Sequence, residues 1–263
     1  MDNESPIKAL IVVTATALVC SVLVTVAAVT LQPIQRAYQD LDRIRFIVRI
    51  SGKAEAIEAM SDLEIIGAFQ SLDARIVDLD RGLFDDSRNP DTFDTRELAT
   101  DPQFSSAIPA DQDFASLGRR PSLVTVYLDR EGNAIRRAIL PVYGRGMWST
   151  IYGYLAIDSD LNTIVDMAIT EQGETPGIGD VILRPDWQAQ WRGKKLYGDD
   201  GAFRFRISRD AIDPASEAAA YHVDGLAGAT VTVNGVMNLM RYWFGPHGYG
   251  PFLENLSAGG GRL

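Results

Sequence analysis

The apolar residues near the amino terminus form one unbroken run. Residues 9–31 contain no charged side chain, and Val, Ala, Leu and Thr dominate among them. At a helical rise of about 1.5 Å per residue the run reaches roughly 34 Å, enough to cross a hydrocarbon core of about 30 Å. A cleaved secretory signal usually has an apolar stretch of only about 7–15 residues. The length therefore favours one uncleaved transmembrane helix over a signal peptide.

Beyond this run, apolar residues recur at helical spacing among charged ones. The spacing predicts that the membrane helix continues past Pro33, with its apolar positions at Ile34, Tyr38, Leu41, Ile44 and Val48. The pair Ser51-Gly52 predicts a break in this helix. A second amphipathic stretch at residues 54–79 predicts another helix. Residues 32–80 are therefore assigned to a helical stalk.

The periodicity changes from helix to strand in the second half of the chain. Residues 81–120 are rich in Asp, Pro, Ser and Arg and predict a surface loop. Alternating apolar residues then predict an antiparallel sheet, with strands near 122–128, 135–142, 151–157 and 163–170 and a short strand at 203–207. A last amphipathic helix is expected from about Asn234 to Phe244, ending at Gly245-Pro246.

This order of elements predicts an α+β fold, with helices first, an antiparallel sheet in the middle and a closing helix. The domain assignment that follows is a short tail at 1–8, a transmembrane helix at 9–31, the stalk at 32–80, an α+β domain at 81–256 and a flexible tail at 257–263.

Charge and cysteine content narrow the possible functions. A formal charge of −10 argues against nucleic acid as a partner, because binding phosphates requires a basic face. The only cysteine, Cys20, lies inside the apolar run, which excludes an internal disulfide, an iron–sulfur cluster and a thiolate zinc site. Redox chemistry in this chain would therefore need an organic cofactor.

One segment offers a place for a phosphate, and it runs from Asp224 to Thr230 directly into the last helix. Gly228 and Ala229 leave the backbone open to close approach, and the unpaired N–H groups of a helix start favour an anion. The hydroxyl of Thr230 lies at the same place. The residues also fit an ordinary helix start with Thr230 or Thr232 as N-cap, which is the simpler interpretation on spacing alone.

The segment resembles the signature Asp-x-x-Ser/Thr-Gly-Ala-Thr, at which bacterial flavin transferases attach FMN through its phosphate to the final threonine. The whole chain resembles the family formed by the C subunits of the sodium-translocating NADH:quinone reductases. The similar blocks are residues 31–33, 146–154, 173–179, 228–230 with 234–236, and 248–253. Three positions depart from the family pattern, namely Ala227, where Ser or Thr is preferred, Gln172 and Val233.

The resemblance implies one covalent FMN on Thr230, with Asp224, Gly228, Ala229 and Thr232 around the attachment point. It also draws attention to the segment Glu174-Thr175-Pro176-Gly177, which could surround an edge of the flavin, since Pro fixes the chain and glycines admit a flat ring. Trp148 could stack on that ring. Without the family, a simple turn at 174–177 and a packing role for Trp148 are the expected assignments.

As a member of this family, the chain would be an electron-relay subunit without a bond-making active site of its own. Its FMN would take electrons from an iron–sulfur centre held by other subunits and pass them to a neighbouring covalent flavin. Its partners would be those subunits, a flavin transferase during maturation, and the membrane through one helix.

The resemblance places the soluble domain on the periplasmic side of the bacterial inner membrane. The charges beside the span suggest the opposite, because Lys8 alone precedes it while Arg36, Arg43, Arg45, Arg49 and Lys53 follow it. Long domains cross membranes despite such a bias, so the count has little weight. Two alternatives remain at this stage: the flavin subunit of the related Rnf ferredoxin:NAD oxidoreductase complex, and an anchored binding or sensor domain without a cofactor.

Overall fold

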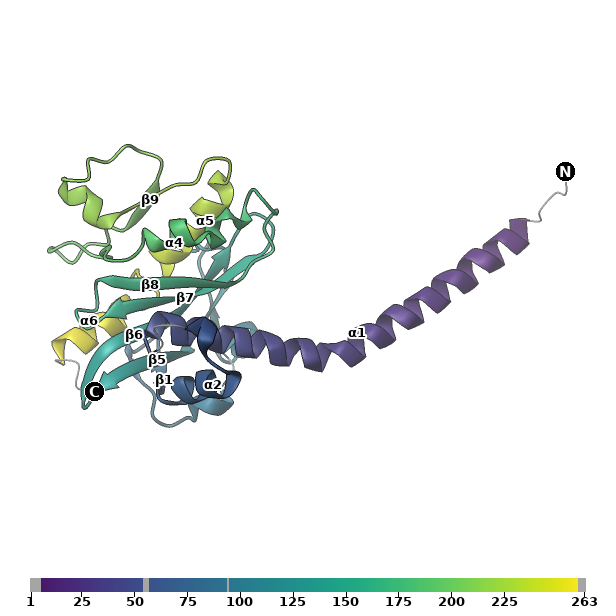
Figure 1. Ribbon diagram of the computed structural model, residues 1–263, viewed down its shortest axis with the longest axis horizontal. Helices are drawn as coiled ribbons and strands as arrows, with labels where there is room; N and C mark the ends of the chain where they lie inside the picture. The colour runs from purple at the N-terminus through teal and green to yellow at the C-terminus, as the bar shows by residue number, and fades with distance from the viewer. Residues whose placement is uncertain (1–5, 54–56, 94, 260–263) are drawn as a thin grey trace. The chain divides into compact units, whose positions relative to one another are not determined.

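A single long helix, α1 (Pro6–Ser51), begins the computed structural model, which describes residues 6–53, 57–93 and 95–259 (Figure 1). The helix contains a window of mean hydropathy 2.6 and is long and apolar enough to cross a membrane. It ends at Ser51, where Gly52 has a φ of +72°, a conformation that favours glycine. The predicted break at Ser51-Gly52 is confirmed.

The chain forms two compact units, which divide after Ile44. The first contains most of α1. The second begins at Arg45 and therefore includes the last turns of the helix, where Ile47, Val48 and Ile50 are buried. These turns belong to the globular unit because their side chains are part of its core.

The helix predicted at residues 54–79 is correct only in part. The structure has a short 3-10 helix η1 (Ile57–Ala59) and then α2 (Asp62–Gln70), whose start is closed by a capping box between Ser61 and Glu64. The next residues form strand β1 (Asp73–Asp78), so the predicted helical stalk gives way to a strand of the main sheet. Ile76 and Val77 are compatible with either element, and pairing with a neighbouring strand decides between them.

The main sheet has six antiparallel strands in the order β2-β1-β5-β6-β7-β8. Their bounds are β2 (Leu83–Phe84), β5 (Leu123–Glu131), β6 (Ala134–Arg145), β7 (Thr150–Asp158) and β8 (Ile164–Glu171). The four long strands expected from the alternating pattern are confirmed. Because β5 to β8 are consecutive along the chain and antiparallel, each loop between them lies at one end of the sheet.

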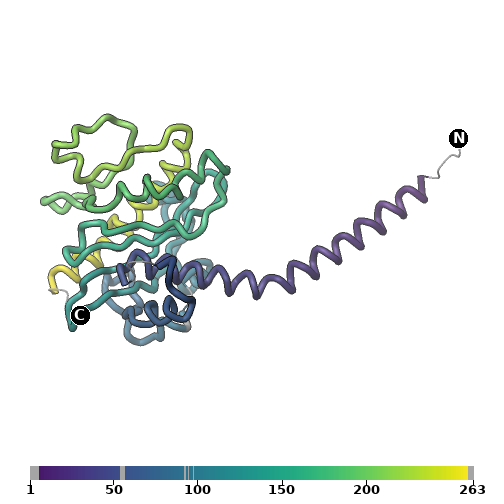
Figure 2. Tube along the Cα trace, viewed as in Figure 1, coloured from purple at the N-terminus to yellow at the C-terminus, as the bar shows by residue number. Residues whose placement is uncertain are grey.

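Both faces of this sheet are covered. One face packs in the large core with the C-terminal helices α5 (Thr230–Trp243) and α6 (Gly250–Ala258), yellow in Figure 2. The other face forms a smaller cluster with Ile47 and Ile50 of α1. Along β5, Val126 and Leu128 belong to the first cluster and Tyr127 to the second, as the period of two in a strand requires. The α+β fold with flanking helices is confirmed.

Short elements connect these parts. The predicted loop at 81–120 contains β2 together with η2 (Pro90–Thr92), α3 (Thr95–Thr100), β3 (Ser105–Ala107) and β4 (Arg119–Pro121). Between β8 and α5 lie η3 (Asp180–Leu183), α4 (Pro185–Ala189), β9 (Arg206–Ser208), η4 (Glu217–Tyr221) and β10 (His222–Asp224). The strand predicted at 203–207 is therefore shorter and begins later.

Helix α6 was missed by the sequence pattern, although proline in its first turn is a known start signal. The predicted flexible tail at 257–263 overlaps the end of this helix, and its last residues, 260–263, lie outside the described part of the chain. Residues 1–5 of the predicted amino-terminal tail and residues 54–56 of the predicted second helix also lie outside it.

Candidate cofactor site

The start of α5 has no side-chain cap. Gly228 has a φ of +82°, Ala229 occupies the N-cap position without a side-chain hydrogen bond, and Thr230 is the first residue of the helix. The side chain of Thr230 is exposed. Because the first N–H groups of a helix have no partner within it, this end attracts an anion. The alternative with Thr230 or Thr232 as N-cap is therefore wrong, since the helix begins earlier than the pattern suggested.

Thr232 instead lies inside the helix and is 1% exposed. Its hydroxyl donates a hydrogen bond of 2.5 Å to Oε2 of Glu174, which is itself only 4% exposed. This bond joins α5 to the loop that follows β8. The side chain of Thr232 thus positions a loop rather than capping its own helix.

Glu174 also holds the hairpin loop between β6 and β7. Its carboxylate accepts backbone N–H groups from Met147 at 3.1 Å, Trp148 at 3.1 Å and Ser149 at 3.4 Å. Burial by itself would raise the pKa of this carboxyl, but the hydrogen bonds from Thr232 and from the three N–H groups outweigh it, so the pKa of Glu174 is lowered. The group is an ionised acceptor that ties together three segments of the chain.

Close packing around this carboxylate explains a nearby glycine. A Cβ on Gly179 would lie 2.7 Å from Cβ of Glu174 and 3.0 Å from the hydroxyl oxygen of Thr232. Any larger residue would push the loop away from α5. The chain around Glu174 is therefore built for contact between the loop and the helix.

Trp148 projects from the hairpin loop and is 61% exposed. Its indole Nε1–H donates to the hydroxyl of Thr175 at 3.0 Å, which fixes the edge of the ring while leaving most of it open to solvent. Without the family, a place in the core or at an interface was expected; this exposure does not fit the core but fits an interface.

These three segments enclose one pocket of about 260 Å³. Of the residues selected from the sequence it brings together Trp148, Glu174, Thr175, Gly228, Ala229, Thr230 and Thr232. Sequence reasoning missed four others that line it: Met147, Ile178, Gly179 and Val231. One feature of the sequence could have indicated these four residues: they are apolar or small, and they lie inside or next to the blocks that carried the family resemblance.

The rim of this pocket is unusually apolar. Met147, Trp148, Ile178 and Val231 are all large, apolar and about half or more exposed. Beyond α1, few other large apolar side chains of the described residues are as exposed, so these four are a local concentration. An apolar rim beside an open helix start suits a ligand with a flat apolar part and a phosphate.

Three selected residues do not line the pocket, namely Asp224, Pro176 and Gly177. Pro176 and Gly177 are exposed at the turn that carries Thr175, and the N–H of Gly177 donates to Asp180 at 2.7 Å. They shape the loop rather than face the cavity.

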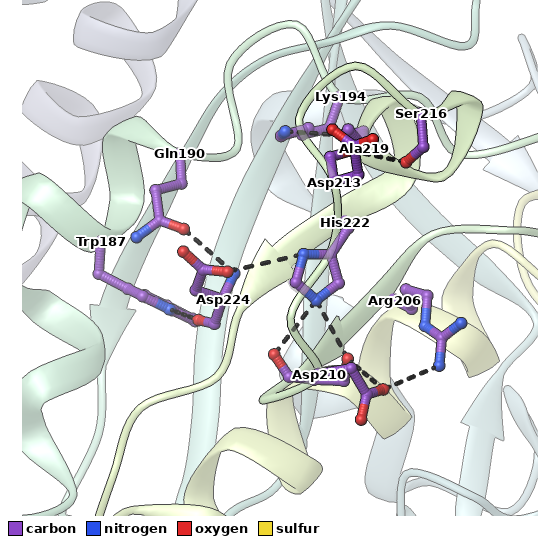
Figure 3. A network of polar contacts seen from close by, with 11 residues as sticks. Trp187, Gln190, Lys194, Arg206, Asp210, Asp213, Ser216, Ala219, His222 and Asp224 are labelled. Atoms are coloured by element: carbon purple, nitrogen blue, oxygen red, sulfur yellow. Dashed lines mark hydrogen bonds and ion pairs between the residues drawn. The ribbon is translucent and has the colours of Figure 1, made fainter.

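Asp224 belongs to a separate network before the attachment segment (Figure 3). Its carbonyl oxygen accepts from the indole of Trp187 at 2.7 Å, and its N–H donates to Gln190 at 3.1 Å. Its carboxylate lies 3.7 Å from Nδ1 of the buried His222. In this arrangement Asp224 anchors the beginning of the segment that leads to Thr230.

Comparison with known proteins gives a consistent picture. A family model for the FMN-binding domain matches residues 146–245, a range that includes every residue lining the pocket. The chain is 42% identical to the C subunit of the Na(+)-translocating NADH-quinone reductase of Pseudomonas aeruginosa, over 98% of both chains. It is 40% identical to the protein of that name from Yersinia pestis, over 98% of this chain and 96% of the other.

Solved structures agree with this comparison. The crystal structure of Shewanella oneidensis NqrC matches with a TM-score of 0.69 and 35% identity, over 76% of this chain and 90% of that one. The C subunit of the Na(+)-translocating NADH-quinone reductase from Parabacteroides distasonis matches with a TM-score of 0.60 and 26% identity, over 85% and 96% of the two chains.

Proposed function

Because the chain belongs to the family of the Na(+)-translocating NADH-quinone reductase C subunits, which are parts of an oxidoreductase complex, and has an FMN-binding domain, we propose that it carries FMN covalently. The attachment is a phosphoester on the hydroxyl of Thr230. Its role is to relay electrons from an iron–sulfur centre of other subunits to a neighbouring flavin.

The observation that carries this proposal is the exposed hydroxyl of Thr230 at an uncapped helix start in the wall of the pocket. A phosphoester there keeps a negative charge, which the partial positive charge of the helix end stabilises. Gly228 and Ala229 present no long side chain that would keep a transferase from this hydroxyl.

The rest of the pocket suits the flavin ring. Trp148, Ile178 and Met147 provide apolar contact area, and the hydrogen bond between Trp148 and Thr175 restricts the rotation of the indole. The bound flavin would supply the one- and two-electron redox chemistry. Since the rim is open, electrons can pass to a partner that docks against it, and the protein needs no acid–base group for this step.

Anchoring by residues 9–31 places the electron carrier beside the membrane subunits. The apolar side chains of α1 in this range are exposed and need a lipid or protein environment. We assign the globular unit to the periplasmic side, as the family resemblance implies, and the flavin transferase that loads it acts on that side.

The two alternatives are less well supported. A cofactor-free sensor domain does not account for the match to an FMN-binding domain over residues 146–245. The relatives that match over almost their full length are named for the sodium-translocating enzyme, which favours it over the Rnf complex.

The test is expression of the full chain with and without a flavin transferase, followed by denaturing gel electrophoresis and fluorescence of the bands. A flavin band is expected only with the transferase, and Thr230→Ala should abolish it. Thr232→Ala tests the neighbouring hydroxyl: it should keep the flavin band but lower the thermal stability, because it removes the hydrogen bond to Glu174, so the stability of each variant is measured alongside. A dark band from cells with the transferase, or an FMN mass on the Thr232 position after peptide mapping, would refute the assignment.

A further inference from the structure

A second pocket adjoins the same β-hairpin, and no step of the proposed function uses it. It has a volume of about 160 Å³ and shares no lining residue with the first pocket. Arg145 and Thr150, the last paired residues before the loop between β6 and β7, lie in its wall, whereas Met147 and Trp148 in that loop belong to the first pocket. Its remaining walls come from α3, from Tyr143 and Tyr152 of the sheet and from the loop before β4.

Three arginines line this second pocket, and they are unequally paired. Arg96 forms an ion pair of 2.7 Å with Glu171 and lies 4.0 Å from the ring centre of Tyr152. Among the described residues, Arg119 donates to neutral groups alone, namely the hydroxyl of Ser105 at 2.9 Å and its carbonyl at 2.6 Å. The side chain of Arg145 has no hydrogen bond or ion pair within the part of the chain that the structure describes.

Within the part of the chain that the structure describes, no acidic side chain lines this pocket. Close to the pocket, Asp113 accepts the N–H groups of Leu117 and Gly118, both at 2.8 Å, and is occupied by them. The chain has a formal charge of −10, but in this pocket the guanidinium groups of Arg119 and Arg145 have no carboxylate partner among the described residues. The local charge of the pocket is therefore positive.

A neutral donor in the same wall also lacks an acceptor. The hydroxyl of Tyr143 is buried without a hydrogen-bond partner among the described residues. Its ring is fixed by stacking on Tyr152 at 5.5 Å between centres and by packing on Trp243 at 5.0 Å. Burial raises the pKa of Tyr143, so the phenol keeps its proton at neutral pH and can only gain by donating it.

The pocket therefore has an excess of hydrogen-bond donors and positive charge over acceptors. We propose that it binds an oxyanion, a carboxylate or a phosphate group, held by Arg145 and Arg119, and that a small side-chain movement on binding gives the buried hydroxyl of Tyr143 an acceptor. Guanidinium groups recognise these planar or tetrahedral oxyanions through paired N–H donors. The small volume suits one such group rather than a whole nucleotide.

The oxyanion can come from a soluble small molecule or from an acidic side chain of a neighbouring subunit. In either case it joins α3 and the loop before β4 to the strand ends that carry the hairpin loop in the wall of the flavin pocket. The proposal does not depend on covalent flavin, since none of its residues takes part in the attachment.

The first experiment titrates inorganic phosphate or succinate into the purified full chain in detergent, at constant ionic strength, and follows the thermal midpoint. With a soluble oxyanion, the midpoint rises, and Arg145→Gln weakens the apparent affinity at least about fivefold, while Arg145→Lys, which keeps the charge but not the paired donors, weakens it less. Arg184→Gln is the control, because this exposed arginine lines neither pocket and pairs with Asp186. It should leave the affinity unchanged.

Tyr143→Phe should change how the thermal midpoint depends on the anion concentration, which the loss of a purely structural tyrosine would not do. Without anion this variant should be at least as stable as the parent, because it removes a buried donor that has no partner among the described residues. With anion the parent should gain more than the variant, so the difference between the two midpoints shifts in favour of the parent as the anion concentration rises.

The second experiment tests the neighbouring subunit as the source. The complex is purified from membranes through another subunit, and the amount of this chain that co-purifies is measured for Arg145→Glu, Arg145→Lys and the control Arg184→Glu. A carboxylate partner predicts a loss with Arg145→Glu alone. Binding of free anions that depends on Arg145, or this selective loss, supports the proposal. Anion binding that is absent or independent of Arg145, together with unaffected assembly, would overturn it.

Discussion

The contact between Thr232 and Glu174 makes a quantitative prediction about stability. We consider the flavin-free protein, in which only the fold is measured. Thr232→Val keeps the volume of the side chain and removes the hydroxyl that donates to the carboxylate at 2.5 Å. The carboxylate retains its three backbone donors at 3.1–3.4 Å, so its charge stays solvated by the protein.

The expected cost follows from the kind of bond that is lost. Hydrogen bonds to charged groups contribute about 1.5–3 kcal/mol, and this one is buried at both ends, so Thr232→Val should lower the free energy of unfolding by about 2 kcal/mol. Glu174→Gln should cost more, about 3 kcal/mol, because it removes the charge and turns one acceptor oxygen into a donor beside other donors.

Chemical denaturation followed by tryptophan fluorescence measures both changes. Thr230→Val is the matched control, since it alters the same helix at an exposed hydroxyl and should change the free energy by less than about 0.5 kcal/mol. If Thr232→Val were no more destabilising than Thr230→Val, the hydrogen bond to Glu174 would not hold the loop on the helix, and the account of the site given above would fail.

Folding lowers the pKa of Glu174, so the stabilisation from its carboxylate is present above the unfolded pKa of about 4.3 and is lost as the pH falls through the folded pKa. The stability difference between the parent and Glu174→Gln, measured by denaturation across pH 3–7, should therefore shrink below about pH 4. A difference that grew there would contradict this linkage. Thr230→Ser keeps the hydroxyl and should retain partial flavin fluorescence on a denaturing gel, and a band as dark as that of Thr230→Ala would show that the methyl group is required. A reporter that is active only in the cytoplasm, fused to the carboxyl terminus, should stay silent, and activity would place the domain inside the cell.

Local patterns were sufficient for the regular parts of the fold. The long apolar run predicted the first helix, and alternating residues predicted the strands from β5 to β8, because the side-chain period of a helix or strand is visible within a short window. Helix α5 was found for the same reason, although its first turn was missed. The family resemblance was confirmed by the comparisons, since its blocks are spread over the whole chain.

Strand β1 shows the limit of this reasoning. Its residues satisfy a helical spacing that continues from α2, and nothing within the segment reveals that β5 lies beside it. Only the tertiary structure supplies a pairing partner from more than forty residues away along the chain. For short apolar segments such pairing outweighs intrinsic preference.

For the candidate site, too, some features could be predicted from the sequence and others depend on the tertiary structure. Local features of the sequence indicated a helix start at Thr230 and a turn at 174–177, and only the family resemblance made these residues candidates for contact with FMN. The sequence pattern assigned Thr232 to a cap, whereas the structure shows its hydroxyl bonded to Glu174, 58 positions away. Stacking of Trp148 on the flavin stays a prediction, and the structure adds that Thr175 holds the edge of the indole. Nothing in the sequence indicated that three arginines from separate elements share a second pocket. Periodicity and turn chemistry are properties of neighbouring residues, but hydrogen-bond partners and pockets depend on which distant segments packing brings together.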